Sequence, residues 1–239
     1  MRPCLLLALA TLCVLPACRK SPLLSADPLP DSSRSLATAA SPALPAASAP
    51  IALPPADLSG SMTLERALVL RHSVREFEPH PMSPAQLSQL AWAAQGMTDA
   101  TTARRTSPSA GATYPMEVYF ATADGVSHYI PGRHAMQRIS TRDVRRSLTT
   151  QQAVAEAPCV IVLTTVTERT RKKYGERAER YVAMEAGHIG QNVLLQATAM
   201  GLGGVPVGGF DGDKAREVLA LDKSEEPLYI LAIGKPAAK

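Results

Sequence analysis

The clearest periodic pattern of apolar residues lies late in the chain, between residues 178 and 200. Apolar residues recur there every three or four positions, which predicts a long amphipathic helix with a buried face. They are Val182, Ala186, Ile189, Val193, Ala197 and Met200. Gly187 and Gly190 lie inside this helix, where each glycine costs about 1 kcal/mol relative to alanine. We expect another helix to approach closely at the two glycines, within the domain or across a dimer.

Shorter patterns predict two more helices and several strands. Thr63 is a predicted N-cap for a helix that continues to about Leu70. Residues 83–86, Ser-Pro-Ala-Gln, combine an N-cap, a first-turn proline and a capping-box glutamine, so a second helix is predicted from there to Gly96. Strands are predicted at 116–122, 127–130, 159–165 and 228–233. Because helices and strands alternate irregularly, the pattern predicts an α+β fold and not regular βαβ units.

The N-terminal segment has the features of an export signal. Arg2 precedes an apolar run over residues 5–15, which is too short to span a bilayer. The run ends in Leu-Pro-Ala-Cys at residues 15–18, which resembles a bacterial lipobox. The resemblance implies a signal peptide at residues 1–17, acylation of Cys18 and an exported lipoprotein on the periplasmic side of a cell-envelope membrane. The alternative is an ordinary signal peptide that is cut near Ala17.

Residues 18–60 differ in composition from the rest of the chain. Alanine, serine and proline dominate this segment, and the first aromatic residue of the whole chain is Phe77. Such a composition buries too little apolar surface to offset the entropy of ordering, and its prolines favour extended conformations. The segment therefore predicts a disordered tether, followed by one folded domain over residues 61–239.

The cysteines, the histidines and the distribution of charge argue against a reactive thiol, a metal site and a nucleic-acid partner. Of the four cysteines, Cys159 lies in an apolar run, where we expect a small buried hydrophobe. The five histidines form no pair at the spacing of metal ligands, so no metal site is predicted. The net charge is only +4, and the densest basic run, residues 169–180, contains a single aromatic residue. We interpret that run as a solvated helix face and expect no nucleic-acid partner.

Four short segments contain the candidate binding chemistry. RHSVREF, residues 71–77, offers guanidinium and hydroxyl donors for a phosphate where the first helix ends. PSAGATYP, residues 108–115, consists mainly of small, turn-forming residues. VPVGGF, residues 205–210, has two adjacent glycines whose backbone N–H groups are unshielded. EAGHIGQN, residues 185–192, lies on the long helix. Each segment alone also fits an ordinary helix end, loop, turn or packed helix.

In this order and spacing, the four segments resemble the flavin-binding segments of the nitroreductase family. The resemblance covers about residues 64–236 and implies a mostly antiparallel central sheet with flanking helices. It also implies an intertwined homodimer with FMN at the interface. The implied FMN contacts are Arg71, Ser73, Arg75, Ser109, Ala110, Gly111, Pro206, Val207, Gly208, Gly209 and Lys235. Many nitroreductases have a glutamate where Gly208 stands, and some have a longer C-terminal basic arm than this chain.

The pair Lys173-Tyr174 resembles the catalytic pair of the SagB/ThcOx-type branch, known as azoline dehydrogenases. The resemblance implies that one of the two removes a proton from a small organic or peptide substrate while hydride passes to flavin N5. Either residue can act as the base only if its surroundings favour the deprotonated form, and Lys172 is a neighbouring like charge. The alternative is a solvated pair at an exposed helix start. Because exported compartments hold little NAD(P)H and the chain lacks a dinucleotide fingerprint, we expect electrons to leave to oxygen or a quinone.

The polar residues of the long helix allow a further prediction. Glu185, His188, Gln191 and Asn192 are spaced so that subsets share a face. Glutamine and asparagine are poor metal ligands, so we expect a buried hydrogen-bond network at the dimer interface. Two other functions compete with an enzyme: a non-catalytic envelope lipoprotein that holds a flavin or another flat ligand on the same fold, and a structural lipoprotein without flavin.

Overall fold

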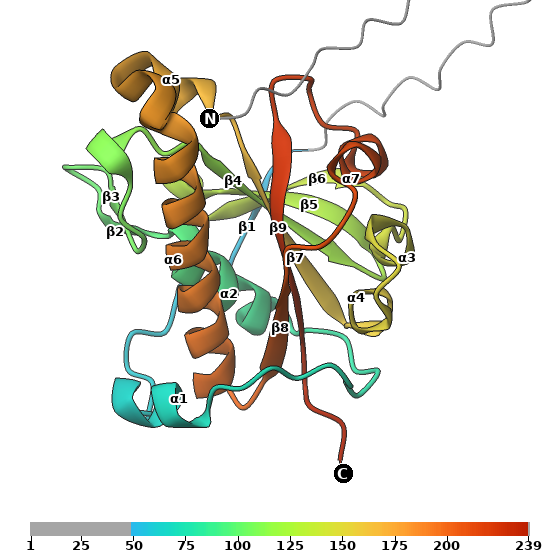
Figure 1. The fold of residues 1–239 in the computed structure, drawn as a ribbon. Helices are drawn as coiled ribbons and strands as arrows, with labels where there is room; N and C mark the ends of the chain where they lie inside the picture. The colour runs from blue at the N-terminus through green and yellow to red at the C-terminus, as the bar shows by residue number, and fades with distance from the viewer. Residues whose placement is uncertain (1–48, 239) are drawn as a thin grey trace, which may run out of the picture. The chain divides into compact units, whose positions relative to one another are not determined.

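The computed structural model describes residues 49–238, which fold around a seven-stranded sheet (Figure 1). The strand order is β1-β6-β5-β4-β7-β9-β8, and every neighbouring pair is antiparallel. The strands are β1 (Ile51–Ala52), β4 (Met116–Thr122), β5 (Gly125–Ile130), β6 (Ala135–Ser140), β7 (Cys159–Thr165), β8 (Gly203–Val207) and β9 (Glu226–Gly234). A separate hairpin pairs β2 (Met97–Asp99) with β3 (Arg104–Arg105). The predicted α+β fold with an antiparallel sheet is confirmed.

Helices cover both faces of this sheet (Figure 1). One face packs against α2 (Pro84–Gln95) and the long helix α6 (Ala178–Ala199), which also contacts α1 (Leu64–Leu70) and α5 (Glu168–Tyr174). The other face packs against the shorter helices α3 (Arg145–Leu148), α4 (Gln152–Glu156) and α7 (Gly212–Leu219). None of the helices between residues 49 and 238 is both long and apolar enough to cross a membrane.

The predicted helix ends are confirmed by their side chains. Thr63 Oγ1 accepts a hydrogen bond from Arg66 N at 3.2 Å. Ser83 and Gln86 form the capping box, in which each side chain accepts from the other residue's backbone N–H, at 2.9 and 3.2 Å. Such reciprocal caps satisfy amide groups that the first helical turn leaves without partners. The start of α2 is therefore determined locally, before any tertiary contact.

Strand β7 lies in the middle of the sheet and is buried along its whole length. Cys159, Ile161 and Leu163 point to the face that packs on α6, while the alternating Val160 and Val162 belong to the opposite core. The prediction that Cys159 is a buried hydrophobe is confirmed, and burial raises the pKa of its thiol to about 12. A thiol with such a pKa stays protonated at neutral pH and is a poor nucleophile.

The folded domain begins before residue 61, earlier than predicted. Ile51 and Ala52 form β1, which pairs with β6, and Leu53 packs against the core. Asp57 N donates to Gln89 Oε1 on α2 at 2.8 Å. The end of the predicted tether is thus held by sheet pairing and helix contacts that its alanine and proline content does not reveal. The predicted signal peptide, Cys18 and the rest of the tether lie outside the described residues.

The two glycines of α6 have different surroundings. A Cβ atom at Gly190 would lie 3.0 Å from the ring carbon Cε1 of Tyr229, so this glycine allows strand β9 to approach the helix. A Cβ atom at Gly187 would meet no atom within 4 Å. The prediction of close packing at Gly190 is therefore right about the approach but wrong about the partner, which is a strand and not a helix.

Candidate functional site

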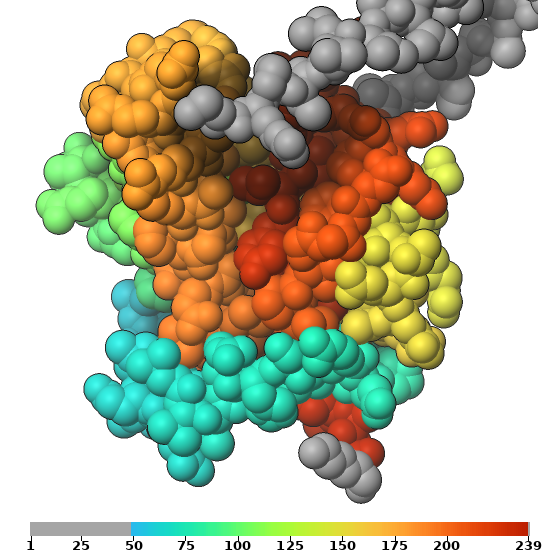
Figure 2. Space-filling model, in the orientation of Figure 1, coloured from blue at the N-terminus to red at the C-terminus, as the bar shows by residue number. Residues whose placement is uncertain are grey.

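The segment that follows α1 crosses the ends of β8 and β9. Ser73 forms a parallel bridge with Gly204, and Val74 N donates to Gly204 O at 3.0 Å. A Cβ atom at Gly204 would lie 2.4 Å from Ile233 Cδ1, so only glycine fits in this packing. In the space-filling view, the teal residues of α1 and of the following segment run across the lower end of α6 (Figure 2). This pairing holds Arg71 and Arg75 beside the sheet edge.

The predicted cofactor contacts in this region lie along one edge of the sheet. Arg71 is half-buried, whereas Ser73 and Arg75 are exposed. Gly208 and Gly209 directly follow β8 and are also exposed, and a Cβ atom on either would meet no atom within 4 Å. The backbone is therefore open to a flat ligand here. We call this region, Arg71 to Arg75 together with residues 203–209, the glycine edge.

Lys235 lies at the same end of the sheet but has an acidic partner. Its Nζ atom is 2.9 Å from Glu78 Oε2, and His80 Nδ1 is 3.2 Å from the same oxygen. The backbone joins the two residues as well, because Glu78 N donates to Lys235 O at 2.9 Å. A phosphate at the glycine edge would have to compete with Glu78 for this ammonium group.

The second group of predicted residues surrounds the loop of residues 109–114. Helix α5 contacts this loop through three of its residues. Arg169 NH1 donates to Tyr114 O at 3.1 Å, Thr170 Oγ1 lies 2.8 Å from Thr113 Oγ1, and Lys173 Nζ donates to Gly111 O at 3.2 Å. The candidate catalytic pair Lys173-Tyr174 is thus brought to the loop that the sequence predicts to lie along a flavin.

Glycine is favoured at position 111 by both conformation and space. Its φ is 59°, in the left-handed region, and a Cβ atom there would lie 2.6 Å from both Lys173 Nζ and Tyr174 Oη. We expect Gly111→Ala to lower the free energy of unfolding by about 1–3 kcal/mol, because alanine is strained at this φ and displaces the pair. Urea unfolding measures the change. Gly132→Ala is the control, since a Cβ at Gly132 meets nothing within 4 Å; equal losses in both variants would contradict the assignment.

Glu185 and Asn192 hold the chain just before this loop. Gln95 Nε2 donates to Glu185 Oε1 at 3.5 Å, and Asn192 Nδ2 donates to Ser107 Oγ at 3.0 Å. Burial raises the pKa of Glu185 to about 7, although hydrogen bonding from Ser109 and Gln95 and the charge of Arg105 oppose the rise. Inside one protomer, Glu185 and Asn192 therefore bond to separate partners, and the network at a dimer interface stays a prediction. The other predicted members, His188 and Gln191, are exposed.

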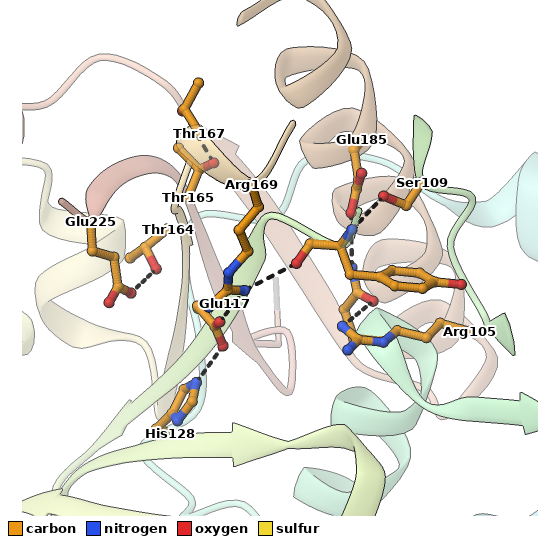
Figure 3. A network of polar contacts seen from close by, with 12 residues as sticks. Arg105, Ser109, Glu117, His128, Thr164, Thr165, Thr167, Arg169, Glu185 and Glu225 are labelled. Carbon is orange, nitrogen blue, oxygen red and sulfur yellow. Dashed lines mark hydrogen bonds and ion pairs between the residues drawn. The ribbon is translucent and has the colours of Figure 1, made fainter. Parts of the chain in front are cut away.

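A second carboxylate, Glu117 on β4, approaches the loop from the sheet (Figure 3). Its two oxygens lie 2.6 Å from Arg169 NH1 and 2.8 Å from His128 Nε2. Burial alone would raise the pKa of Glu117, but the hydrogen bonds and charges of His128 and Arg169 lower it below its usual value. Arg169 was not predicted as a site residue, although it stands four residues before Lys173 and so shares its helix face. No sequence signal pointed to Glu117.

The part of the glycine edge that follows α1 lies at the opposite end of α6 from α5 and the loop (Figure 1), whereas Val207 pairs with Ile230 beside the middle of that helix. The loop packs on α5, which directly precedes α6, whereas Gly204 and its partner Ser73 follow the C-terminal end of that helix. A helix of 22 residues is about 33 Å long. One chain therefore does not bring Lys173 next to Arg71. Within residues 49–238, no three His, Cys, Asp or Glu side chains are grouped so that they could hold a metal ion.

Both the sequence and the fold of this chain are similar to those of known proteins. A nitroreductase-like protein of Methanocaldococcus jannaschii is 42% identical over 182 residues, which cover 72% of this chain and 90% of that protein. The crystal structure of a nitroreductase-like protein from Ralstonia eutropha JMP134 superposes with a TM-score of 0.75 at 31% identity, covering 80% of this chain and 90% of the other.

A more distant relative is the microcin B17-processing protein McbC of Escherichia coli. It is 27% identical over 152 residues, which cover 57% of this chain and 56% of McbC. The chain thus spans little more than half of that protein. The model of the nitroreductase family, in contrast, matches residues 68–235, which include the glycine edge, the loop and the whole of α6. This chain belongs to the nitroreductase family.

Proposed function

We propose that this protein is an FMN-dependent dehydrogenase of the SagB/ThcOx type, which transfers hydride between flavin N5 and a small organic or peptide substrate. Proteins of the nitroreductase family are generally FMN-dependent oxidoreductases. The observation that carries the finer proposal is the contact of Lys173 Nζ with Gly111 O at 3.2 Å, with Tyr174 Oη beside the same residue. The similarity to McbC also supports it.

The glycine edge has the donors and the open backbone that FMN requires. Arg71, Ser73 and Arg75 would bind the phosphate and ribityl chain, since guanidinium and hydroxyl groups suit a dianion. The exposed backbone at Gly208 and Gly209, with Pro206 and Val207 before it, would lie against the ring. Ser109, Ala110 and Gly111 would contact it from the loop. Bound FMN supplies a two-electron acceptor, which no side chain of the protein can replace.

Lys173 and Tyr174 would handle the proton in this reaction. Lys173 lies on the last turn of the seven-residue helix α5, held by the carbonyl of Gly111. Tyr174 is half-buried, and its ring meets that of Tyr181 edge-on at 4.9 Å between centroids. These contacts orient the ammonium and the hydroxyl toward the same small residue. Either group, once deprotonated, can accept a proton from a substrate carbon at this point.

We further propose that two copies of the chain combine to form each site. The loop of one protomer would then face the glycine edge of its partner. Lys173 of one chain could thus share a site with Arg71 of the other, although the two residues are far apart within one chain. Large apolar side chains are exposed on α1 and α6, where Leu64 is 60%, Val69 75% and Met184 46% exposed. Exposed apolar surface of this kind is typical of protein–protein interfaces.

For the N-terminal segment, we propose a signal peptide at residues 1–17 and a lipid anchor on Cys18. The chain between Cys18 and β1 would hold the enzyme away from an envelope membrane. In that compartment, oxygen or a quinone would receive the electrons. The sequence pattern of residues 1–18 supports this part of the proposal.

An absorbance spectrum of the purified protein with and without added FMN tests the central proposal. We expect flavin bands near about 370 and 450 nm, bleached by a reductant and restored by an acceptor. Arg71→Ala should weaken FMN binding about 10- to 100-fold, because a charge-assisted hydrogen bond is lost. Arg133→Ala, an exposed arginine on the turn before β6, is the matched control.

Two results of this experiment would contradict the proposal. Colourless protein that takes up no FMN would exclude a flavoenzyme and leave a structural role for the fold. Flavin that binds but is never reduced or reoxidised would instead favour the non-catalytic ligand-binding protein.

A further inference from the structure

Tyr114, at the end of the loop, has a backbone conformation that a tyrosine rarely adopts. Its φ is 43°, and Ala112 nearby has φ of 55°. Left-handed conformations are unfavourable for residues with a Cβ atom, so they persist only where the surroundings hold them. Something outside the loop must therefore keep residues 109–114 in this shape.

Tyr114 has three contacts, one each at its backbone N–H, its ring and its carbonyl. Its backbone N–H donates to Ser109 Oγ at 2.9 Å, which closes the loop on itself. Its ring lies under the guanidinium of Arg105, 4.2 Å from the ring centroid. Its carbonyl accepts from Arg169 NH1 at 3.1 Å. Among these contacts, the last joins the strained residue to α5, which carries Lys173 and Tyr174.

Arg169 is itself fixed by the sheet. The same NH1 atom lies 2.6 Å from Glu117 Oε1, and the Glu117 side chain is only 17% exposed on β4 (Figure 3). His128 on β5 holds the second oxygen of Glu117 at 2.8 Å. A charge pair with one well-buried member and a third partner has more fixed geometry than an isolated surface pair. The position of Arg169 is thus fixed by contacts with the sheet.

Helix α5 depends on tertiary contacts for its position, both on the ion pair of Arg169 and on the contacts of Arg171 and Tyr174 with α6. It has seven residues, no side-chain N-cap, and Thr170 as its buried residue. Helices this short are not stable alone, so tertiary contacts determine where they lie. Its contacts with the loop come from Arg169, Thr170 and Lys173.

We propose that Arg169 is a positioning residue that joins Glu117, the loop of residues 109–114 and α5, and thereby sets the place of Lys173 and Tyr174. The link to catalysis rests on the proposed function, whereas the mechanical link does not. The guanidinium of Arg169 bonds to Tyr114 O and Glu117, whereas the ammonium of Lys173 bonds to Gly111 O. Arg169 would act on Lys173 and Tyr174 through the carbonyl of Tyr114 and through helix α5, to which all of these residues except Tyr114 belong.

Hydrogen exchange of the flavin-free protein tests the mechanical link. In Arg169→Ala, we expect the hydrogen-bonded amides of residues 112–114 to exchange about tenfold faster than in the wild type, because the strained loop opens more often. Arg169→Lys keeps a charged donor and should restore part of the protection. Arg171→Ala is the control on the same helix, since Arg171 pairs with Glu168 and Glu179. It should exchange like the wild type.

Chemical labelling of the lysines gives a second measurement, which a general loss of protein stability would not change. Lys172 and Lys173 are adjacent and both exposed, and Lys173 donates to the loop carbonyl of Gly111. We expect Arg169→Ala to raise the acetylation rate of Lys173 severalfold relative to Lys172 in the same peptide. A global loss of stability would raise both rates alike and leave their ratio unchanged.

The outcomes separate this inference from the proposed function, since neither readout needs flavin or substrate. Unchanged exchange and an unchanged labelling ratio in Arg169→Ala would overturn the inference, even if the protein oxidises substrate. If Arg169→Ala does not fold, Glu117→Gln removes the charge that holds Arg169 and must give the same two changes. Where the protein is also active, kcat should fall in Arg169→Ala with little change in KM, and Arg169→Lys should recover part of it.

Discussion

Replacing Lys173 with alanine is expected to slow substrate oxidation by about 10²- to 10⁴-fold while bound flavin is retained. The ammonium group lies at the loop carbonyl of Gly111, where it would meet a substrate carbon, whereas the phosphate donors lie at the other end of α6. Loss of the lysine should therefore affect the proton transfer and not the affinity for FMN. Tyr174→Phe, which removes a single hydroxyl beside the same glycine, should reduce the rate as well.

Anaerobic bleaching of the flavin, followed at about 450 nm with an azoline-containing peptide as the test substrate, measures this rate. Lys172→Ala is the matched control, because Lys172 is the adjacent exposed lysine on α5. We expect this control to keep its activity within about twofold. Full activity in Lys173→Ala would show that the pair is an ordinary solvated surface feature.

The free energy of unfolding should fall by about 3 kcal/mol between pH 4.5 and 7 through Glu185 alone. This carboxyl is 3% exposed, and burial raises its pKa from 4.5 to about 7. In that interval the folded protein binds the proton that the unfolded chain has lost, so stability decreases as pH rises. Each pKa unit corresponds to about 1.4 kcal/mol. Arg105, which faces Glu185 from β3, and the donors Ser109 and Gln95 limit the shift.

Urea unfolding of the wild type and of Glu185→Gln at about pH 4, 6 and 8 measures this contribution. The glutamine does not titrate, so the variant should gain about 3 kcal/mol relative to the wild type between the lowest and the highest pH. Glu176→Gln, on the exposed turn before α6, should follow the wild-type curve. Parallel curves for the wild type and Glu185→Gln would mean that folding does not raise the pKa of Glu185.

Local patterns predicted those elements whose ends are determined by neighbouring residues. The capping box at Ser83 fixes the start of α2, and the apolar spacing of α6 gives its length to within one residue. The fully buried β7 is recognisable from its continuous apolar run. In contrast, β1 was placed in the tether, because its two residues are strand only through pairing with β6.

The site was predictable as a set of segments and not as an arrangement. Arg71, Gly111 and Lys173 were each identified from the residues around them and from a family resemblance. Which of them lie together depends on the path of the chain around α6, and no local pattern encodes that path. The same holds for the ion pair of Glu117 and Arg169, which joins a strand to a helix 52 positions later in the sequence.

The length of α6 has a consequence for how this protein can change during evolution. In the proposed enzyme, substitutions around Gly111 and α5 would alter which molecule is oxidised without touching the residues near Ser73 and Gly204 at the far end of the helix. The effects of substitutions at the two ends on the stability of one protomer should therefore add, since distant sites contribute additively to stability. A single scaffold can in this way keep one cofactor site while its descendants diversify in the chemistry they perform.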